Sequence, residues 1–487
     1  MMKEQSPDPS PETPGGGFVR SVLTLASGTA VAQLLLALAV PALARLYTPA
    51  EYGVLAVYSS ILTVLVVVAS LRYEAAIPLP REESSAGSLL VLTLGIVLAT
   101  GSVVSLLVWL LGGAFVSAVN VPALRPYLWM IPVAFFAAGT YQALSYWAIR
   151  QREFRRLART RMSQGIGQAA AQIGLGLGGA GALGLIVGDV IGRVAGVGSL
   201  ALAAWRTRPA ERPTRASVRE IAARYRRFPL LTTWAGLFNI GSLQLPSIVF
   251  SAAFGAAAAG LYALSFKLLV LPTMLVAQAV GQVFLSRAAR LAAEPEQLRQ
   301  LTERTALGLF AAGLPAYLAV GIAGPELFSL VLGREWLESG RYAQVLAPWF
   351  ALWLVSNPLS GLLSVREWQG SALAFSAFEL LLRLGALLTG AARGSPMLAV
   401  TLLSAGGVVI AGASIVRFLL AGHSSAGRIL GPALRLVALA LGCLLPAALF
   451  FHAGNQRMAL AAAALSLLAY YAIVARSTLA LRLPYLP

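Results

Sequence analysis

Long apolar runs alternate with short polar, basic connections over nearly the whole chain. Each run has about 20 residues or more, which is long enough for a helix to cross a bilayer. We predict fourteen spans, or twelve if some of the very short connections at Gly181, Gly255 and Gly370 do not separate two spans. The predicted spans are 20–45, 51–71, 87–111, 126–149, 162–181, 183–205, 228–253, 257–285, 305–332, 342–365, 371–391, 397–420, 430–451 and 457–478. The pattern therefore predicts an all-α polytopic membrane protein.

The composition supports this class. Hydrophobic residues make up 58% of the chain, charged residues 11%, and the mean hydropathy is +0.77. A soluble domain usually carries about 25% charged residues. One cysteine and two histidines give no disulfide framework and no metal-ligand cluster, so we expect no metal and no cofactor. Residues 1–17 are polar and rich in Pro and Gly, which predicts a disordered cytoplasmic tail rather than a cleavable signal peptide.

The basic residues set the predicted orientation. An inside N-terminus puts 28 of the 37 lysines and arginines in inside segments, 6 in outside segments and 3 within spans. Cytoplasmic connections of membrane proteins carry such an excess, so both termini are predicted to be cytoplasmic. Since the basic residues lie in short connections between spans, the net charge of +18 does not predict nucleic-acid binding.

The longest inside connection divides the predicted spans into six and eight. This connection, 206–227, is basic, contains two prolines and ends in a short amphipathic pattern. We predict that it is a linker whose basic face lies on anionic headgroups. The predicted organisation is a tail (1–17), an N-lobe (18–205), the linker, a C-lobe (228–420) and an extra helix pair (421–487).

The two predicted lobes share a weak internal repeat. Residues 52–62 match residues 259–269 at an offset of 207, which pairs Gly53 with Gly260. Parallel repeats in transporters are related by an axis along the membrane normal. We predict such an axis between the lobes.

Lys267 lies inside the eighth predicted span, and the only other lysine is Lys3 in the tail. A charge near the middle of a bilayer helix costs about 3 kcal/mol or more, so it usually faces a cavity. Pro272 follows five residues on and loosens the helix there. This pattern predicts an inward-facing cation on an anion pathway. The alternative is that Lys267 reaches a surface or pairs with an acid.

Two acid–base pairs also fall inside spans. Asp189 and Arg193 are four residues apart, as are Glu379 and Arg383, so each pair shares a helical face. Such pairs either hold helices together or couple transport to an ion, and the spacing does not separate these readings.

Polar residues at the ends and interiors of the spans are further candidates for lining a cavity. These candidates are Arg72, Glu74, Gln33, Asn239, Gln244, Gln278 and Gln282. Amides in a bilayer either bridge helices or bind sugar hydroxyls. There is no phosphate-binding GxxxxGK[ST] loop and no nucleophile–base–acid set, so we predict no catalytic residues.

Several stretches resemble the bacterial O-antigen and exopolysaccharide flippases of the multidrug/oligosaccharidyl-lipid/polysaccharide exporter superfamily. They are LYTPAEYGVLAVYSSIL (46–62), LRYEAAIPLP (71–80), YQALSYWAIRQREFRRLARTR (141–161), GLIVGDVIGR (184–193), RRFPLLTTWAGLFNIGSLQLPSIVF (226–250) and GLYALSFKLLVLPTMLVAQAVGQVF (260–284). They cover most of residues 18–290, whereas the remainder matches only in hydropathy.

The resemblance implies two six-helix lobes around a cavity that opens alternately to each side of the bacterial inner membrane. The implied substrate is an oligosaccharide on undecaprenyl pyrophosphate, moved from the inner to the outer leaflet. Membrane lipid is an implied partner, with a polysaccharide polymerase and chain-length proteins as further ones. The two additional C-terminal spans resemble those of lipid II flippases.

Three alternatives remain open at this point. One is a lipid II-type flippase, and another is a drug/ion antiporter of the same fold. The third is a polysaccharide polymerase or ligase, although such an enzyme usually needs a sizeable outside loop. The longest outside connection, near 333–341, is too short to be a domain.

Overall fold

The computed structural model describes residues 16–207, 213–365, 369–453 and 455–480, and all regular elements in these ranges are helical. The first elements are α1 (Gly16–Leu46), α2 (Pro49–Val67), η1 (Tyr73–Ala76), α3 (Glu83–Ala118), η2 (Pro122–Tyr127), α4 (Met130–Arg150), α5 (Phe154–Leu177), α6 (Ala182–Val194), α7 (Val197–Arg206) and α8 (Arg215–Arg224). The following elements are η3 (Phe228–Thr232), α9 (Thr233–Arg290), α10 (Pro295–Leu332), η4 (Arg334–Trp336), α11 (Leu337–Leu359), α12 (Leu362–Val365), α13 (Gln369–Ala392), α14 (Pro396–Ala421), α15 (Ala426–His452) and α16 (Gln456–Ala480). Most of the predicted tail, residues 1–15, and residues 208–212 of the predicted linker lie outside the described ranges.

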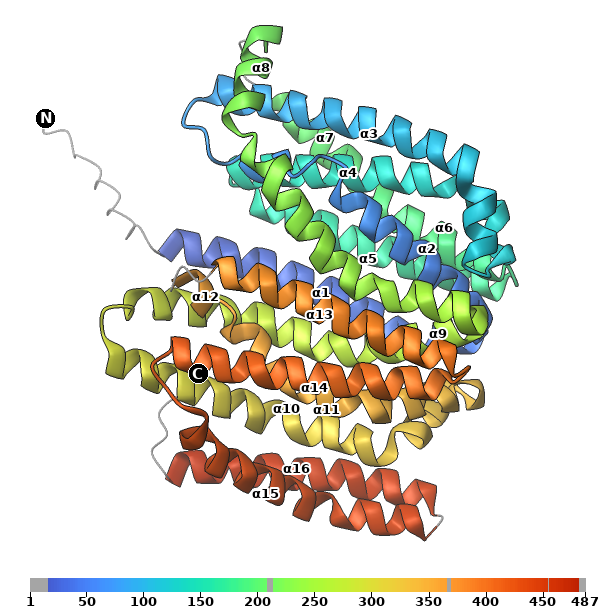
Figure 1. The fold of residues 1–487 in the computed structure, drawn as a ribbon, viewed down its shortest axis with the longest axis vertical. Helices are drawn as coiled ribbons and strands as arrows, with labels where there is room; N and C mark the ends of the chain where they lie inside the picture. The colour runs from blue at the N-terminus through green and yellow to red at the C-terminus, as the bar shows by residue number, and fades with distance from the viewer. Residues whose placement is uncertain (1–15, 208–212, 366–368, 454, 481–487) are drawn as a thin grey trace, which may run out of the picture.

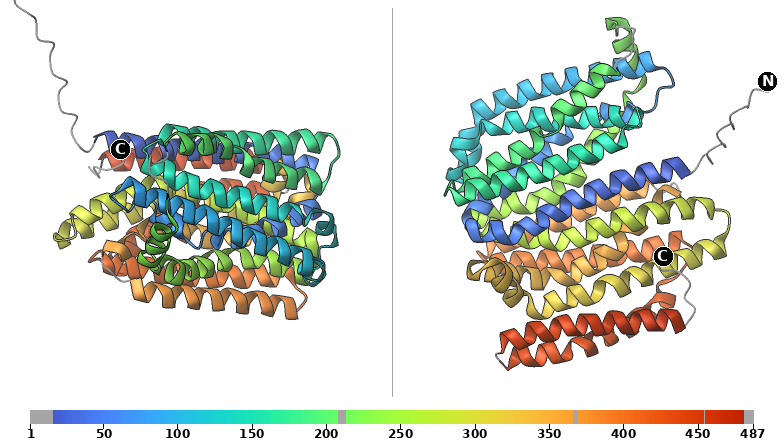
Figure 2. Two further views of the ribbon diagram at one scale, coloured as in Figure 1. Left: turned by 90° about the horizontal axis from the view of Figure 1, so that it is seen from above. Right: turned by 180° about the vertical axis from the view of Figure 1, so that it is seen from behind.

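The helices run side by side and gather into two bundles (Figure 1). The first bundle contains α1–α7, and the second contains both arms of α9 together with α10–α14. The pair α15–α16 packs against α10 at the far edge of the second bundle (Figures 1 and 2).

The structure shows local reasons for two helix boundaries. Thr48 caps α2: its side chain accepts the Glu51 backbone N–H, while the Glu51 carboxylate accepts the Thr48 backbone N–H at 2.8 Å. This capping box, with Pro49 in the first turn, starts the helix. Gly255 interrupts α9 with φ 85° and ψ 171°, a conformation that only glycine adopts readily. The chain folds back there, so the predicted span 257–285 lies in the second arm of α9, and the predicted span 228–253 lies in η3 and the first arm of α9.

Eight stretches among the described residues are long and apolar enough to cross a membrane. The most apolar, Glu83–Ala118, has a mean hydropathy of 2.4 and leaves most of its residues unburied. Its exposed side chains include Leu98, Leu106 and Trp109, the last of which is 80% exposed. An apolar outer surface of this size suits contact with acyl chains rather than water. The protein is therefore a multi-pass membrane protein.

Several helices extend beyond the predicted spans at the end that carries the linker. α5 begins at Phe154 instead of residue 162, and α10 begins at Pro295 instead of residue 305. Hydropathy marks only the apolar part of a helix, whereas a helix continues where its polar turns are stabilised. Arg299 provides such a case, because it donates to Glu303 at 2.9 Å one turn further along α10.

The linker helix α8 docks on the first bundle. Ile221 is buried there against a cluster that includes Trp147, and the Ser217 and Ser88 hydroxyls are 3.1 Å apart. Arg219 and Arg224 remain exposed. The predicted amphipathic helix is thus present, with its apolar side packed on protein, and contact of its basic side with headgroups stays a prediction.

The two bundles meet at the end of the molecule that contains Gly255. Trp336 Nε1 donates to the Ala44 carbonyl at 2.8 Å, and its ring lies 5.1 Å from the Tyr52 ring. Arg45 Nη2 also donates to the carbonyl of Val331 at 3.4 Å. These contacts join α1 and α2 directly to the end of α10 and to η4.

At the same end, α2 crosses α9 at backbone contact. A Cβ on Gly53 would overlap the carbonyl oxygen of Ala256, and a Cβ on Gly260 would overlap that of Pro49. The offset of 207 that relates Gly53 to Gly260 also relates Pro49 to Ala256. Two copies that meet across a two-fold axis make the same contact twice. This reciprocal contact agrees with the predicted repeat axis between the bundles.

Candidate functional site

Lys267 projects from α9 toward the first bundle. Its side chain is exposed, whereas Ser265 and Leu269 on the same helix are buried in the second bundle. The carboxylate of Asp189 on α6 is close enough to interact electrostatically with the ammonium group. Lys267 therefore belongs to the surface on which the second bundle faces the first.

Asp189 is already paired with Arg193. Arg193 Nε donates to Asp189 Oδ2 at 2.6 Å, and Arg193 Nη2 donates to Oδ1 at 3.4 Å. Such a two-point pair is geometrically specific and strong. Lys267 is a second basic side chain beside this carboxylate.

The second predicted pair, Glu379 and Arg383, has different surroundings. Arg383 is buried, donates to Glu379 on its own helix, and donates to the Ser242 hydroxyl on α9 at 3.2 Å. Its guanidinium also lies over the Trp349 ring of α11, 5.2 Å from the centroid. These contacts hold α13 against α9 and α11. They favour the first of the two predicted roles of the pair, which is to hold helices together.

The predicted amides do not form one site. Gln33, Asn239 and Gln282 are exposed. Gln244 accepts a hydrogen bond from the Ser60 hydroxyl of α2 at 3.0 Å, so it bridges α2 and α9. The side chain of Gln278 lies outside the described part of the structure.

The Arg72–Glu74 segment forms a tight turn between α2 and α3. Glu74 is fully buried, accepts from the Ser70 hydroxyl, and accepts from Gln142 Nε2 at 2.7 Å. Arg72 Nη1 is 3.9 Å from the Glu74 carboxylate. Burial raises the pKa of Glu74, while the Ser70 and Gln142 hydrogen bonds and the Arg72 charge oppose that rise. In this state the Glu74 oxygens are covered by protein groups.

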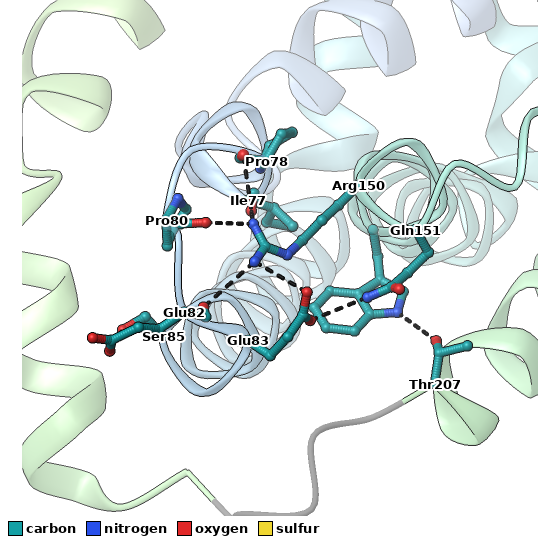
Figure 3. A network of polar contacts seen from close by, with 10 residues as sticks. Ile77, Pro78, Pro80, Glu82, Glu83, Ser85, Arg150, Gln151 and Thr207 are labelled. Atoms are coloured by element: carbon teal, nitrogen blue, oxygen red, sulfur yellow. Dashed lines mark hydrogen bonds and ion pairs between the residues drawn. The ribbon is translucent and has the colours of Figure 1, made fainter. Parts of the chain in front are cut away.

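A clamp around Arg150 fixes the connection that follows this turn (Figure 3). Arg150 Nη1 donates to the Pro80 carbonyl at 2.6 Å, and Arg150 Nη2 donates to the Glu83 carboxylate at 3.2 Å. Gln151 Nε2 donates to the same carboxylate at 3.2 Å. Sequence reasoning missed this clamp and also missed Gln142, because Arg150 is one of several arginines in the same stretch and nothing in their spacing singles it out.

The fold is similar to that of several solved transporters. A solved structure of the lipid II flippase MurJ in an inward closed conformation matches with a TM-score of 0.69 at 10% identity, over 94% of this chain and 100% of that chain. A MATE family transporter of the MOP superfamily matches in its inward-facing conformation with a TM-score of 0.63 at 14% identity, over 83% of this chain and 95% of that chain. A MATE family transporter of the MOP superfamily in its outward-facing conformation matches with a TM-score of 0.53 at 14% identity, over 87% of this chain and 99% of that chain. At such identities the likeness shows the fold alone.

Residues 42–341 match a family described as polysaccharide biosynthesis protein. Since the match spans more than half of the chain, this protein belongs to that family. The resemblance to polysaccharide flippases is thereby confirmed at the level of the family. No curated protein matches the sequence.

Proposed function

We propose that this protein moves an oligosaccharide linked to undecaprenyl pyrophosphate from the inner to the outer leaflet of a bacterial inner membrane by alternating access. Membership of a polysaccharide biosynthesis family supports a role in handling such substrates. A fold shared with flippases and exporters supports transport rather than covalent chemistry. The protein is therefore proposed to be a transporter and not an enzyme.

The observation that carries this proposal is the group of Lys267, Asp189 and Arg193 between the bundles. A pyrophosphate cannot cross hydrocarbon bare, because an unpaired charge in an apolar medium costs many times the thermal energy. Lys267 faces the other bundle, beside a carboxylate that is already paired with Arg193. We infer that the ammonium binds the pyrophosphate while the polyprenyl tail remains in lipid.

Alternating access requires the bundles to be joined at one end at a time. The described contacts between residues 44–53 and the segments near Ala256 and Trp336 join them at the Gly255 end. The arginine distribution predicts that this end is periplasmic. The better match to inward-facing than to outward-facing relatives supports an inward-facing state.

We further propose fourteen spans. Five further helices are not among the eight long apolar stretches, yet they have 21 to 31 residues. They are α1, α4, α5, α11 and α13. The eight apolar stretches, these five helices and the second arm of α9 together give the fourteen proposed spans.

Binding of undecaprenyl pyrophosphate to the purified protein tests the role of Lys267. Hydrogen bonds to charged groups contribute about 1.5–3 kcal/mol, so we expect Lys267→Ala to weaken binding by roughly 10–100-fold. Lys267→Arg should retain most of the affinity, and Lys3→Ala is the matched control. Equal affinity of Lys267→Ala and the wild type, in protein that is equally well folded, would show that the ammonium does not bind the substrate.

A further inference from the structure

We propose that Gln344 of α11 is a positioning residue that holds a bend in α10 near Pro325 and thereby closes the Gly255 end of the molecule. The bend seats the last turns of α10 against the first bundle, and its release opens this end. The inference goes beyond the proposed function, because it names the element that moves and involves no substrate. It can therefore be tested on the empty protein.

α10 is kinked at Ala323, two residues before Pro325. Ala323 has φ −122° and ψ 23°, which departs from the helical conformation. Pro325 has no N–H to donate to the Gly321 carbonyl, and its ring pushes that carbonyl away. Inside a membrane protein a neighbouring helix has to satisfy such a carbonyl, because the bilayer supplies no water. Gln344 Nε2 does so, and donates to the Gly321 carbonyl at 2.8 Å.

Two glycines bring α10 and α11 into backbone contact at the same bend. A Cβ on Gly324 would lie 2.7 Å from the Gly340 carbonyl oxygen, and a Cβ on Gly340 would lie 2.5 Å from the Gly324 carbonyl oxygen. Gly340 precedes Gln344 by about one turn of α11. The backbone contact and the side-chain hydrogen bond therefore hold the bend from the same side.

α11 is itself anchored to the arm of α9 that carries Lys267. The Ser339 hydroxyl donates to the Leu261 carbonyl at 2.8 Å, and the Ser265 hydroxyl donates to the Ser339 carbonyl at 2.7 Å. Both serines are fully buried. The first turns of α11 thus give Gln344 a fixed position relative to α9, and the bend of α10 is set against that position.

The segment that follows the bend makes contacts with the first bundle. Arg45 of α1 donates to the Val331 carbonyl at 3.4 Å, and Trp336 of η4 donates to the Ala44 carbonyl at 2.8 Å. The Trp336 ring also lies 5.1 Å from the Tyr52 ring of α2. Since Val331 and Trp336 both follow the bend, its direction determines whether they reach α1 and α2.

Other prolines of the second bundle share this arrangement. At four of them, a carbonyl three or four residues earlier, on the turn that the proline distorts, accepts from a side chain of another helix. The proline, the acceptor and the donor are Pro246, Ser242 and Arg383 at 3.3 Å, Pro272, Leu269 and Tyr317 at 2.9 Å, Pro315, Ala312 and Tyr471 at 2.7 Å, and Pro348, Val345 and Ser404 at 2.6 Å. This recurrence indicates that side-chain donors stabilise the proline-containing turns of this bundle.

Spin labels at Arg125→Cys and Arg334→Cys, in a Cys443→Ser background, report the distance between the bundles at this end. Both labelled positions are exposed. Gln344→Met keeps the length of the side chain but removes the donor. In the empty protein we expect it to raise the population of longer distances by about fivefold or more, because a carbonyl left without its donor destabilises the closed arrangement. Gln300→Met, at an exposed position near the other end of α10, should leave the distances unchanged.

A double-mutant cycle separates the hydrogen bond from other effects of the substitution. Pro325→Ala restores an N–H for the Gly321 carbonyl, so adding Gln344→Met to Pro325→Ala should change the distances little. Gly340→Ala provides an independent arm, because its Cβ would overlap a backbone carbonyl of α10 and force the bend apart. It should lengthen the distances, whereas Gly308→Ala should not, since a Cβ there meets nothing within 4 Å.

An unchanged distance distribution in Gln344→Met would overturn the proposal, as would an equal effect of this substitution with and without Pro325→Ala. If Gln344→Met does not fold, an unchanged distribution in Gly340→Ala overturns it instead. These distances are measured without substrate, so the proposal can fail separately from lipid binding by Lys267.

Discussion

Arg383 and Lys267 are both cations within spans, but their surroundings differ. Arg383 is buried and donates to Glu379 and to Ser242. Lys267 is exposed and has an already paired carboxylate, that of Asp189, as its electrostatic neighbour. Arg383 thus acts within the second bundle, whereas Lys267 is the residue that we propose to bind a ligand.

This contrast makes a stability prediction. Removing one partner of a buried ion pair leaves the other uncompensated and costs about 3 kcal/mol. We expect Arg383→Gln to lower the free energy of unfolding by about that amount in an SDS titration of detergent-solubilised protein.

The matched control is Arg341→Gln. Arg341 donates to Glu338 at 2.9 Å, but both side chains are well exposed, and such surface pairs contribute at most about 1 kcal/mol. If Arg383→Gln and Arg341→Gln lowered the free energy of unfolding equally, Arg383 would not be holding the helices of the second bundle together.

For single residues, the sequence shows which charged side chains lie inside spans, but it does not show what each of them does. The apolar context singles out Lys267 and Arg383 equally, because both charges lie inside spans. Only the structure separates them, since the partners Ser242 and Trp349 come from other helices. The Gln142 contact to Glu74 was missed for the same reason: the two residues are 68 positions apart.

Among the elements, α2 and α9 cross at backbone contact. Gly53 and Gly260 leave no room for a side chain, and each faces a backbone carbonyl of the opposite helix. The weak repeat in the sequence predicted that these glycines correspond. The contact shows that the corresponding positions also meet.

Valine at either glycine should separate the bundles at the Gly255 end. The distance between two packed helices varies over about 2 Å with the size of the side chains between them. We therefore expect Gly53→Val or Gly260→Val to lengthen the distance between the bundles at this end by about that amount. Spin labels at Arg125→Cys and Arg334→Cys, both exposed positions, would report it.

Gly241→Val serves as the control for this crossing, since a Cβ there meets nothing within 4 Å. The reciprocal contact also requires Gly53→Val and Gly260→Val to act alike. An effect of only one of them would contradict the two-fold relationship.

The order of the helices followed from hydropathy, but several of their ends did not. Apolar runs place the centre of each span, and Gly255 correctly marked the fold-back in α9. Hydropathy did not predict the polar first turns of α5 and α10. Ion pairs such as Arg299–Glu303 stabilise such turns outside the apolar part of a helix. The break between α6 and α7 was also missed, and it occurs where Gly196 has φ 92°.

For the whole molecule, two bundles that contact one another at the Gly255 end provide parts that alternating access requires. Contacts near Trp336 and Gly53 hold this end together. Toward the other end of the molecule, Arg72 touches Gly236 in the arm of α9 that precedes Gly255. The proposed substrate-binding Lys267 lies in the arm that follows Gly255.

Transfer of a fluorescent undecaprenyl-pyrophosphate-linked oligosaccharide across proteoliposomes tests the central claim most directly. The account predicts that the wild-type protein makes inner-leaflet substrate accessible to an external reagent. It also predicts that Lys267→Ala lowers this rate by at least tenfold, whereas Lys3→Ala leaves it unchanged. No transfer by the wild type above protein-free vesicles, or an undiminished rate in Lys267→Ala, would contradict it.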